Sequence, residues 1–158
     1  MSQLEGVFSI LPTPFNPDGA IDHRSLARVI DLFLRAGGDG FTALGVTSEV
    51  ARLYDREREL VLGTVLERVI GRVSVVVGTT AGGITTCIDY SKMARSAAAS
   101  AVMASPPRMP KLNSESVVRH FRLLAEAVDF RIDSATHKAL DSLLEWIRKK
   151  ENPPWISG

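Results

Sequence analysis

Residues 41–62 read FTALGVTSEVARLYDRERELVL, and this stretch holds a complete strand, loop and helix pattern. The run at 41–45 is short and apolar and does not alternate with polar residues, which is typical of a strand buried on both faces of a parallel sheet. An amphipathic pattern follows Asp55, whose carboxylate we expect to cap the helix. The segment GVTSE at 45–49 joins the two. The stretch therefore predicts one βα unit with a loop at the carboxyl end of its strand.

The same unit recurs along the chain. Branched and small apolar residues make up four runs, each predicted to be a buried strand, at 7–11, 41–45, 73–78 and 101–105. Helical patterns follow them, carried by Leu26, Val29, Ile30 and Phe33 after an Asp22 cap, by Leu62, Val65, Leu66 and Val69, by residues 85–100, and by residues 114–128 after an Asn113 or Ser114 cap. Four βα units in succession predict a parallel sheet covered by helices.

The pattern leaves two architectures open, an open parallel α/β sheet and a closed (β/α)₈ barrel. The chain has 158 residues, whereas a complete barrel takes about 250. Four units amount to roughly half a barrel, so the pattern alone favours the open sheet.

Composition narrows the class of partner. Nineteen Lys plus Arg against eighteen Asp plus Glu give a net charge of +1, with no long run of one sign. We therefore expect neither nucleic acid nor a membrane as partner. The single Cys87 cannot form an internal disulfide, and neither an export signal nor an apolar stretch of about 18 residues is present. We expect a cytoplasmic protein that binds a small molecule.

The loop at 45–49 is the main candidate for a binding site. Gly45 would let the backbone approach a ligand, and the hydroxyls and amides of Thr47 and Ser48 suit a carboxylate or phosphate oxygen. The alternative is a turn that only leads into the next helix, since Ser and Thr in turns are mostly structural. The residues alone leave both readings open.

The other motifs are weaker indications of a functional site. The glycine-rich segment at 78–83, GTTAGG, does not match the G-x-G-x-x-G pattern of dinucleotide sites. Arg108 lies in a proline-rich loop, where it would meet either an anion or solvent. Asp133, Ser134 and His137 lack the nucleophile turn of a hydrolase triad, and a helix start accounts for them better. Cys and His do not cluster at metal-ligand spacing, so we predict no metal and no cofactor.

Three stretches together are similar to the N-terminal half of the dihydrodipicolinate synthase and N-acetylneuraminate lyase family. They are ILPTPFNPDGAID at 10–22, AGGDGFTALGVTSEVARLYDRERE at 36–59 and PPRMPKLNSESVVRHFRLLAEAVD at 106–129, and the resemblance covers about residues 5–129. The family implies a (β/α)₈ barrel and a class I aldolase, in which a lysine forms a Schiff base with pyruvate or a related 2-oxo acid and a carbon–carbon bond is made or broken. The resemblance thus replaces the open sheet by a partial (β/α)₈ TIM barrel of about four βα units.

The resemblance also assigns roles to the loop GVTSE. It corresponds to the family's Gly-Thr-Thr-Gly-Glu loop, which binds the carboxylate of the 2-oxo acid after the second strand, so Gly45, Val46, Thr47 and Ser48 form the expected substrate-binding loop. Thr47 falls on the second threonine and is the expected carboxylate contact. Val46 replaces a hydroxyl of the family's proton relay, and Ser48 replaces a glycine.

The residues that would react are not found. The family carries its catalytic tyrosine on the fifth strand and its lysine on the sixth, whereas Tyr54 and Tyr90 fall in predicted helical regions here. The five lysines, none of them at the end of a predicted strand in an apolar pocket, are Lys92, Lys111, Lys138, Lys149 and Lys150. We therefore identify no catalytic residue and expect the chain to be inactive alone.

The resemblance divides the chain into residues 1–129, the barrel half, and 130–158, a divergent tail. Within the tail, 130–132 is a candidate short strand, and an amphipathic helix is predicted from Leu140, Leu143, Leu144 and Ile147. Two sheet edges would remain open, so either the tail covers one, or two chains pair their half-barrels, or the isolated chain is unstable.

Three functions fit this reading. The first is a truncated or fused family member without aldol chemistry of its own. The second is a half-enzyme completed by a partner chain, and the third is a non-catalytic module that binds a 2-oxo acid or forms an assembly surface. Substrate specificity and oligomeric state are not predicted.

Overall fold

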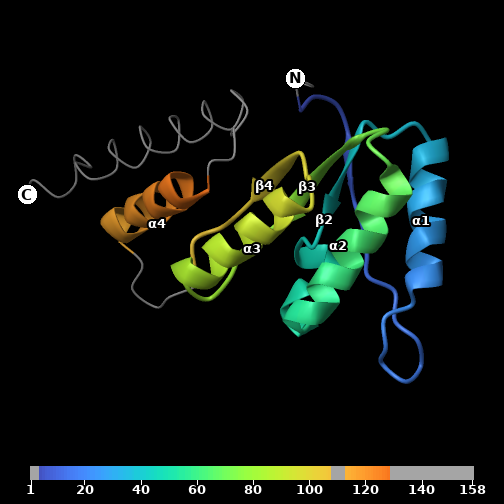
Figure 1. Ribbon diagram of the computed structural model, residues 1–158, viewed down its shortest axis with the longest axis horizontal. Helices are drawn as coiled ribbons and strands as arrows, with labels where there is room; N and C mark the ends of the chain where they lie inside the picture. The colour runs from blue at the N-terminus through green and yellow to red at the C-terminus, as the bar shows by residue number, and fades with distance from the viewer. Residues whose placement is uncertain (1–3, 108–112, 129–158) are drawn as a thin grey trace, which may run out of the picture.

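The computed structural model describes residues 4–107 and 113–128 (Figure 1). The predictions for Arg108, for the strand at 130–132, for the Asp133–Ser134–His137 group and for the tail helix lie outside the described residues.

Four parallel strands form the sheet, and all four predicted strands are confirmed. They are β1 (Phe8–Ile10), β2 (Gly40–Ala43), β3 (Ser74–Gly78) and β4 (Ala101–Met103). Their order in the sheet is the order in the chain, β1-β2-β3-β4. The register pairs Ile10 with Thr42 and Val76 with Ala101.

A helix follows each strand. The helices are α1 (His23–Arg35), α2 (Asp55–Val69), α3 (Ile84–Ser96) and α4 (Ser114–Ala127), and two short 3₁₀ turns, η1 (Val46–Ser48) and η2 (Val50–Arg52), lie between β2 and α2. The third helix was predicted to reach residue 100 but ends four residues earlier. Ala98 adopts a left-handed φ of 62°, and the Ala99 N–H turns back to donate to the Ala94 carbonyl.

Two of the three predicted caps are correct. Asp22 accepts a hydrogen bond from the Ser25 N–H at 2.9 Å, and Asn113 accepts one from the Ser116 N–H at 2.8 Å. The prediction for Asp55 is wrong, because Asp55 is the first residue inside α2 and Tyr54 is the cap. The Tyr54 N–H donates to the Glu57 carboxylate at 2.8 Å. A side chain three residues into the helix thus satisfies the amide of the cap residue.

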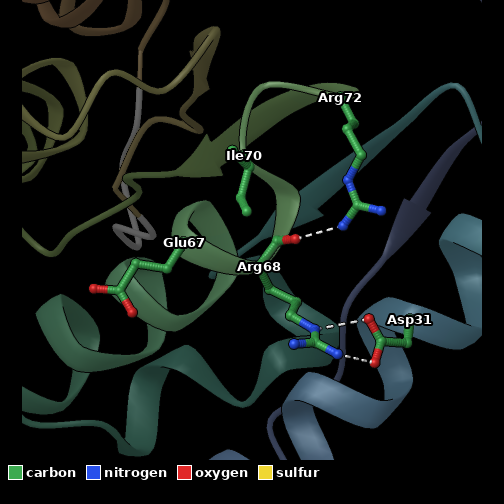
Figure 2. A pocket seen from close by; sticks show the side chains of 5 residues that line it. All are labelled: Asp31, Glu67, Arg68, Ile70 and Arg72. Carbon is green, nitrogen blue, oxygen red and sulfur yellow. Dashed lines mark hydrogen bonds and ion pairs between the residues drawn. The ribbon is translucent and has the colours of Figure 1, made fainter.

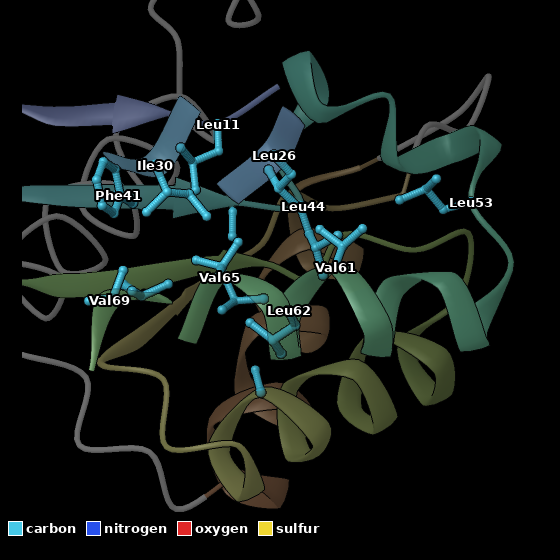
Figure 3. Close-up of a cluster of buried hydrophobic side chains, with 14 residues drawn as sticks. Leu11, Leu26, Ile30, Phe41, Leu44, Leu53, Val61, Leu62, Val65 and Val69 are labelled. Atoms are coloured by element: carbon cyan, nitrogen blue, oxygen red, sulfur yellow. The ribbon is translucent and has the colours of Figure 1, made fainter. Parts of the chain in front are cut away.

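The helices pack on one face of the sheet. Buried side chains of α1, α2 and α3 form a single cluster with alternate residues of β2 and β3, and this cluster includes Leu26, Ile30, Phe41, Ala43, Leu62, Val65, Val75, Val77 and Ala94 (Figure 3). α1 lies beside α2 and α4 beside α3 (Figure 1). A doubly wound sheet would reverse its strand order and place helices on both faces. Consecutive strands with helices on one face are the winding of a (β/α) barrel, so the observed sheet is a barrel segment.

Candidate functional site at the carboxyl ends of the strands

The loops at the carboxyl ends of the four strands form one rim, in which hydrogen bonds join the loop after β1 to that after β2 and the loop after β3 to that after β4. The Ser48 hydroxyl, after β2, donates to the carbonyl of Leu11, after β1, at 2.5 Å. The Thr79 N–H, after β3, donates to the Met103 carbonyl at 2.9 Å. The Ser105 N–H, after β4, donates to the Thr80 hydroxyl at 2.9 Å. Ligands of (β/α) barrels bind at this end of the strands, so the rim is the candidate site.

The loops after β2 and β3 meet at their closest point through Gly78. A Cβ at this position would lie 2.2 Å from the carbonyl oxygen of Leu44. Leu44 itself has a φ of 54°, a left-handed conformation that few residues other than glycine adopt. The absence of a side chain at Gly78 therefore allows the strained end of β2 to turn across the end of β3.

The four residues predicted to form the substrate-binding loop divide into two outward and two inward positions. Gly45 is buried and extended, with φ −80° and ψ −177°, and precedes η1. Val46 and Thr47 are exposed, Val46 to 87%. Ser48 is 1% exposed and its hydroxyl is engaged by Leu11. Thr47 is therefore the only one of the four residues with an exposed side-chain hydroxyl. No hydrogen bond joins this hydroxyl to another described residue.

The segment after the loop is held by a buried arginine that the sequence analysis did not single out. Arg58 is 8% exposed, and its Nη2 donates to the Val50 carbonyl at 2.7 Å. Its guanidinium lies 4.4 Å from the centre of the Tyr90 ring, a cation–π contact. The Tyr90 hydroxyl in turn donates to Asp55 at 2.6 Å, and this bond raises the pKa of Tyr90. Arg58 stands among the charged residues DRERE at 55–59, and nothing in this local pattern indicates its burial.

Behind the rim, a buried polar cluster connects β3 to α3. The Ser91 hydroxyl lies 3.0 Å from the Thr79 hydroxyl and donates to the Cys87 carbonyl at 2.7 Å. Burial raises the pKa of the Cys87 thiol. A thiol that is fully buried and kept protonated is a poor nucleophile, so the cluster packs α3 on the sheet.

The described part of the rim holds no lysine, and Tyr54, at the end of the loop after β2, is its only tyrosine. Lys92 is the only lysine among residues 4–107 and 113–128, and it is exposed on α3. Tyr90 lies in α3, as predicted, whereas Tyr54 lies just before α2 rather than within a helix. A Schiff-base lysine is activated in a desolvated pocket, and the exposed position of Lys92 on α3 does not provide one.

A shallow hollow of about 490 Å³, lined by four charged residues and Ile70, lies at the opposite end of the strands, where α2 leads into β3 (Figure 2). Arg68 spans it to reach Asp31 of α1 through two hydrogen bonds, and Arg72 donates to the Arg68 carbonyl at 2.6 Å. The pair lowers the pKa of the Asp31 carboxyl. Because these cationic groups are engaged by α1 and α2 themselves, the hollow is a contact between helices.

Two histidines lie within the described ranges, and neither belongs to a cluster. His23 begins α1, and its Nδ1 lies 2.9 Å from the Thr64 hydroxyl of α2. His120 of α4 is 5% exposed, and burial lowers its pKa. Within residues 4–107 and 113–128, no group of three His, Cys, Asp or Glu side chains is placed to hold a metal ion. No helix of that part of the chain is long and apolar enough to cross a membrane.

Comparison with known proteins agrees with this geometry. The 4-hydroxy-tetrahydrodipicolinate synthase of Pelobacter propionicus is 37% identical over 125 residues, which are 79% of this chain and 43% of that enzyme. A putative dihydrodipicolinate synthetase from Pseudomonas aeruginosa superposes with a TM-score of 0.77 at 32% identity, over 79% of this chain and 43% of that one. A prophage protein of the dihydrodipicolinic acid synthase family from E. coli K12, solved in complex with pyruvate, superposes with a TM-score of 0.77 at 28% identity, over 82% and 43%.

All of these matches cover only part of the longer proteins. The chain spans less than half the length of the curated relatives it matches. The sheet therefore corresponds to part of a (β/α)₈ barrel, as the resemblance predicted. The sequence profile of the Dihydrodipicolinate synthetase family matches residues 3–132. By this match over most of its length, the chain belongs to the dihydrodipicolinate synthetase family.

Proposed function

We propose that the rim of this half-barrel binds the carboxylate of a 2-oxo acid such as pyruvate through Thr47, and that the chain by itself forms no Schiff base with it. The proposal rests on one combined observation. The described rim has an exposed threonine hydroxyl on η1 but no lysine. In this proposal the chain binds the acid without reacting with it.

Support for Thr47 comes from the geometry of its neighbours. The Ser48 hydroxyl is engaged by the Leu11 carbonyl, and Val46 has no polar atom in its side chain. A carboxylate oxygen accepts hydrogen bonds, and a threonine hydroxyl on a short helical turn can donate one. The pyruvate complex of the E. coli relative supports a 2-oxo acid as the ligand of this family site.

Pyruvate binding is tested by titration calorimetry or by ligand-observed NMR with the full chain. We expect weak binding that Thr47→Val abolishes and that Thr47→Ser retains, because serine keeps the hydroxyl and valine keeps the shape. Thr86→Val, the same change at an exposed position in α3, serves as the control and should bind as the parent does. Unchanged binding in Thr47→Val would remove this residue from the site.

Schiff-base formation is tested separately by borohydride reduction in the presence of pyruvate, followed by mass spectrometry. Borohydride reduces the imine of a lysine and pyruvate to a stable secondary amine, so a reactive lysine gains the mass of a 1-carboxyethyl group. We expect no adduct on any of the five lysines. An adduct on one of them would overturn the proposed inactivity while leaving the carboxylate site untouched.

A further inference from the structure

Both edges of the sheet are unpaired within the described residues. β1 pairs only with β2, and β4 pairs only with β3. Each edge is a row of backbone donors and acceptors that a parallel strand can extend, and such edges in water are normally covered. Because one chain presents a β1 edge on one side and a β4 edge on the other, its two edges are complementary to those of a second copy.

The face of the sheet turned away from the helices is also incompletely covered. Ile10 and Met103 lie on it, in register with Thr42 and with Gly78 respectively, and neither belongs to the helix-side core. Their exposed fractions are 49% and 48%. In a closed barrel this face is the packed interior. A four-stranded segment therefore lacks the side chains that would fill it from the opposite wall.

The helical layer shows the same incompleteness beside α1. Leu26 and Ile30 of α1 face the sheet, and Asp31 contacts Arg68 of α2. At 100° per residue, Leu32 comes to the flank of α1 turned away from α2, where it is 55% exposed. α1 and α4 lie at the two ends of the helical layer (Figure 1). A helix on the far side of β1 would cover Leu32, and the α4 of a second copy would lie there.

We propose that two copies of this chain pair their half-barrels about a two-fold axis, with β4 of each copy beside β1 of the other, to close a ring of eight parallel strands. The matched region is 43% of the length of the full barrels it superposes on, so two copies supply close to one barrel. This dimer would cover both open edges of each sheet, the inner face that holds Ile10 and Met103, and the side of α1 that exposes Leu32.

The pairing has a consequence for the rim. Thr47 of one copy would face the rim of the other across the closed ring, so the space in which a small acid is enclosed is complete only in the dimer. The pairing does not require pyruvate. The mass and the cross-linking that test it are measured without ligand, so they can fail or succeed independently of pyruvate binding.

Light scattering after size-exclusion chromatography tests the pairing. We expect a mass of about twice the 17.2 kDa of the chain. Ile10→Glu and Met103→Glu each place a charge on the inner face and should give monomers. Leu60→Glu, at an α2 position with the same 49% exposure as Ile10, is the matched control and should remain a dimer. A monomeric parent at all concentrations, or a dimer that survives both inner-face variants, would overturn the proposal.

A disulfide test locates the seam even where a glutamate variant fails to fold. Ser9 and Val102 are the middle residues of β1 and β4. Within one chain these strands are three spacings apart, about 14 Å, which is too far for a disulfide. Oxidation of the Ser9→Cys, Val102→Cys double variant should therefore give a covalent dimer, and each single variant should not. No cross-link in the double variant would contradict the β4–β1 seam, and the native Cys87 is buried.

Discussion

At the scale of single residues, Ser48 shows how a position can keep a hydroxyl and use it for the fold. Sequence comparison placed Ser48 in a substrate loop where the family has glycine. Its hydroxyl is buried and bonded to the Leu11 carbonyl, which ties the loop after β2 to the loop after β1. The residue type was visible in the sequence, but its partner, 37 positions away, was not.

Replacing Ser48 by alanine should destabilise the fold by about 1–2 kcal/mol, because the buried Leu11 carbonyl loses its donor. Urea unfolding measures the free energy. Ser96→Ala, at the exposed end of α3, should change it by less than about 0.5 kcal/mol. Equal effects of the two substitutions would show that the Ser48 bond contributes nothing.

Gly78 and Gly63 form a second matched pair. Gly78→Ala should cost about 3 kcal/mol or more, because its Cβ would meet the Leu44 carbonyl at 2.2 Å and backbone must move. Gly63→Ala adds a methyl group with nothing within 4 Å, inside α2. It should stabilise the protein by about 0.5–1 kcal/mol through helix propensity. Thermal unfolding of both variants distinguishes them, and a tolerated Gly78→Ala would mean that β2 and β3 separate easily at the rim.

At the scale of elements, the helices were predicted from periodicity and caps, and their existence was confirmed in each of the four units. The miss at Asp55 has a specific cause. Two acidic residues, Asp55 and Glu57, stand at the start of α2, and either could satisfy a free amide. In the structure Glu57, three residues into the helix, bonds the Tyr54 amide, and Asp55 instead accepts a hydrogen bond from the Tyr90 hydroxyl of α3.

The packing of α4 should depend on pH through His120. Burial lowers the pKa of this imidazole, and its Nε2 is buried without a partner among the described residues. Below about pH 6.5, the ordinary pKa, the unfolded chain binds the proton more readily than the folded one, so stability falls as pH falls through this range. Above it the contribution of His120 is constant.

We therefore expect the melting temperature to drop between pH 7.5 and 5.5 by more in the parent than in His120→Leu. Leucine is apolar, fits a buried position and carries no titrating group. His23→Asn keeps His120 and should retain the larger drop. The same pH dependence in the parent and in His120→Leu would exclude His120 as its source.

At the scale of the whole molecule, the proposed pairing of two copies would give the outer strands the neighbours that the inner strands already have. β2 and β3 are paired on both sides, and every residue of β2 is buried. Within residues 4–107 and 113–128, β1 and β4 are each paired on one side, and their residues Ile10 and Met103 are half exposed. Stability gained by pairing must then depend on protein concentration, since a dimer forms by mass action.

The melting temperature of the parent should rise by a few degrees for each tenfold increase in concentration, which adds about 1.4 kcal/mol per dimer. The melting temperature of the Leu60→Glu variant should rise with concentration in the same way, and that of the Ile10→Glu variant should not. Differential scanning calorimetry over two decades of concentration makes the measurement. A parent melting temperature that is independent of concentration would argue for a chain that is stable as a monomer.

The sequence by itself determined the four βα units, the cap at Asp22, a cap at either Asn113 or Ser114, and the position of the GVTSE loop after a strand. These features are local, because period, cap chemistry and turn residues act over a few positions along the chain. The family resemblance supplied the barrel. Only the tertiary structure decided that Ser48 is bound to Leu11, that Gly78 makes room for Leu44 and that Arg58 is buried beneath Tyr90. Each is a contact between separate elements, and such contacts exist only once the sheet has brought the strand ends together.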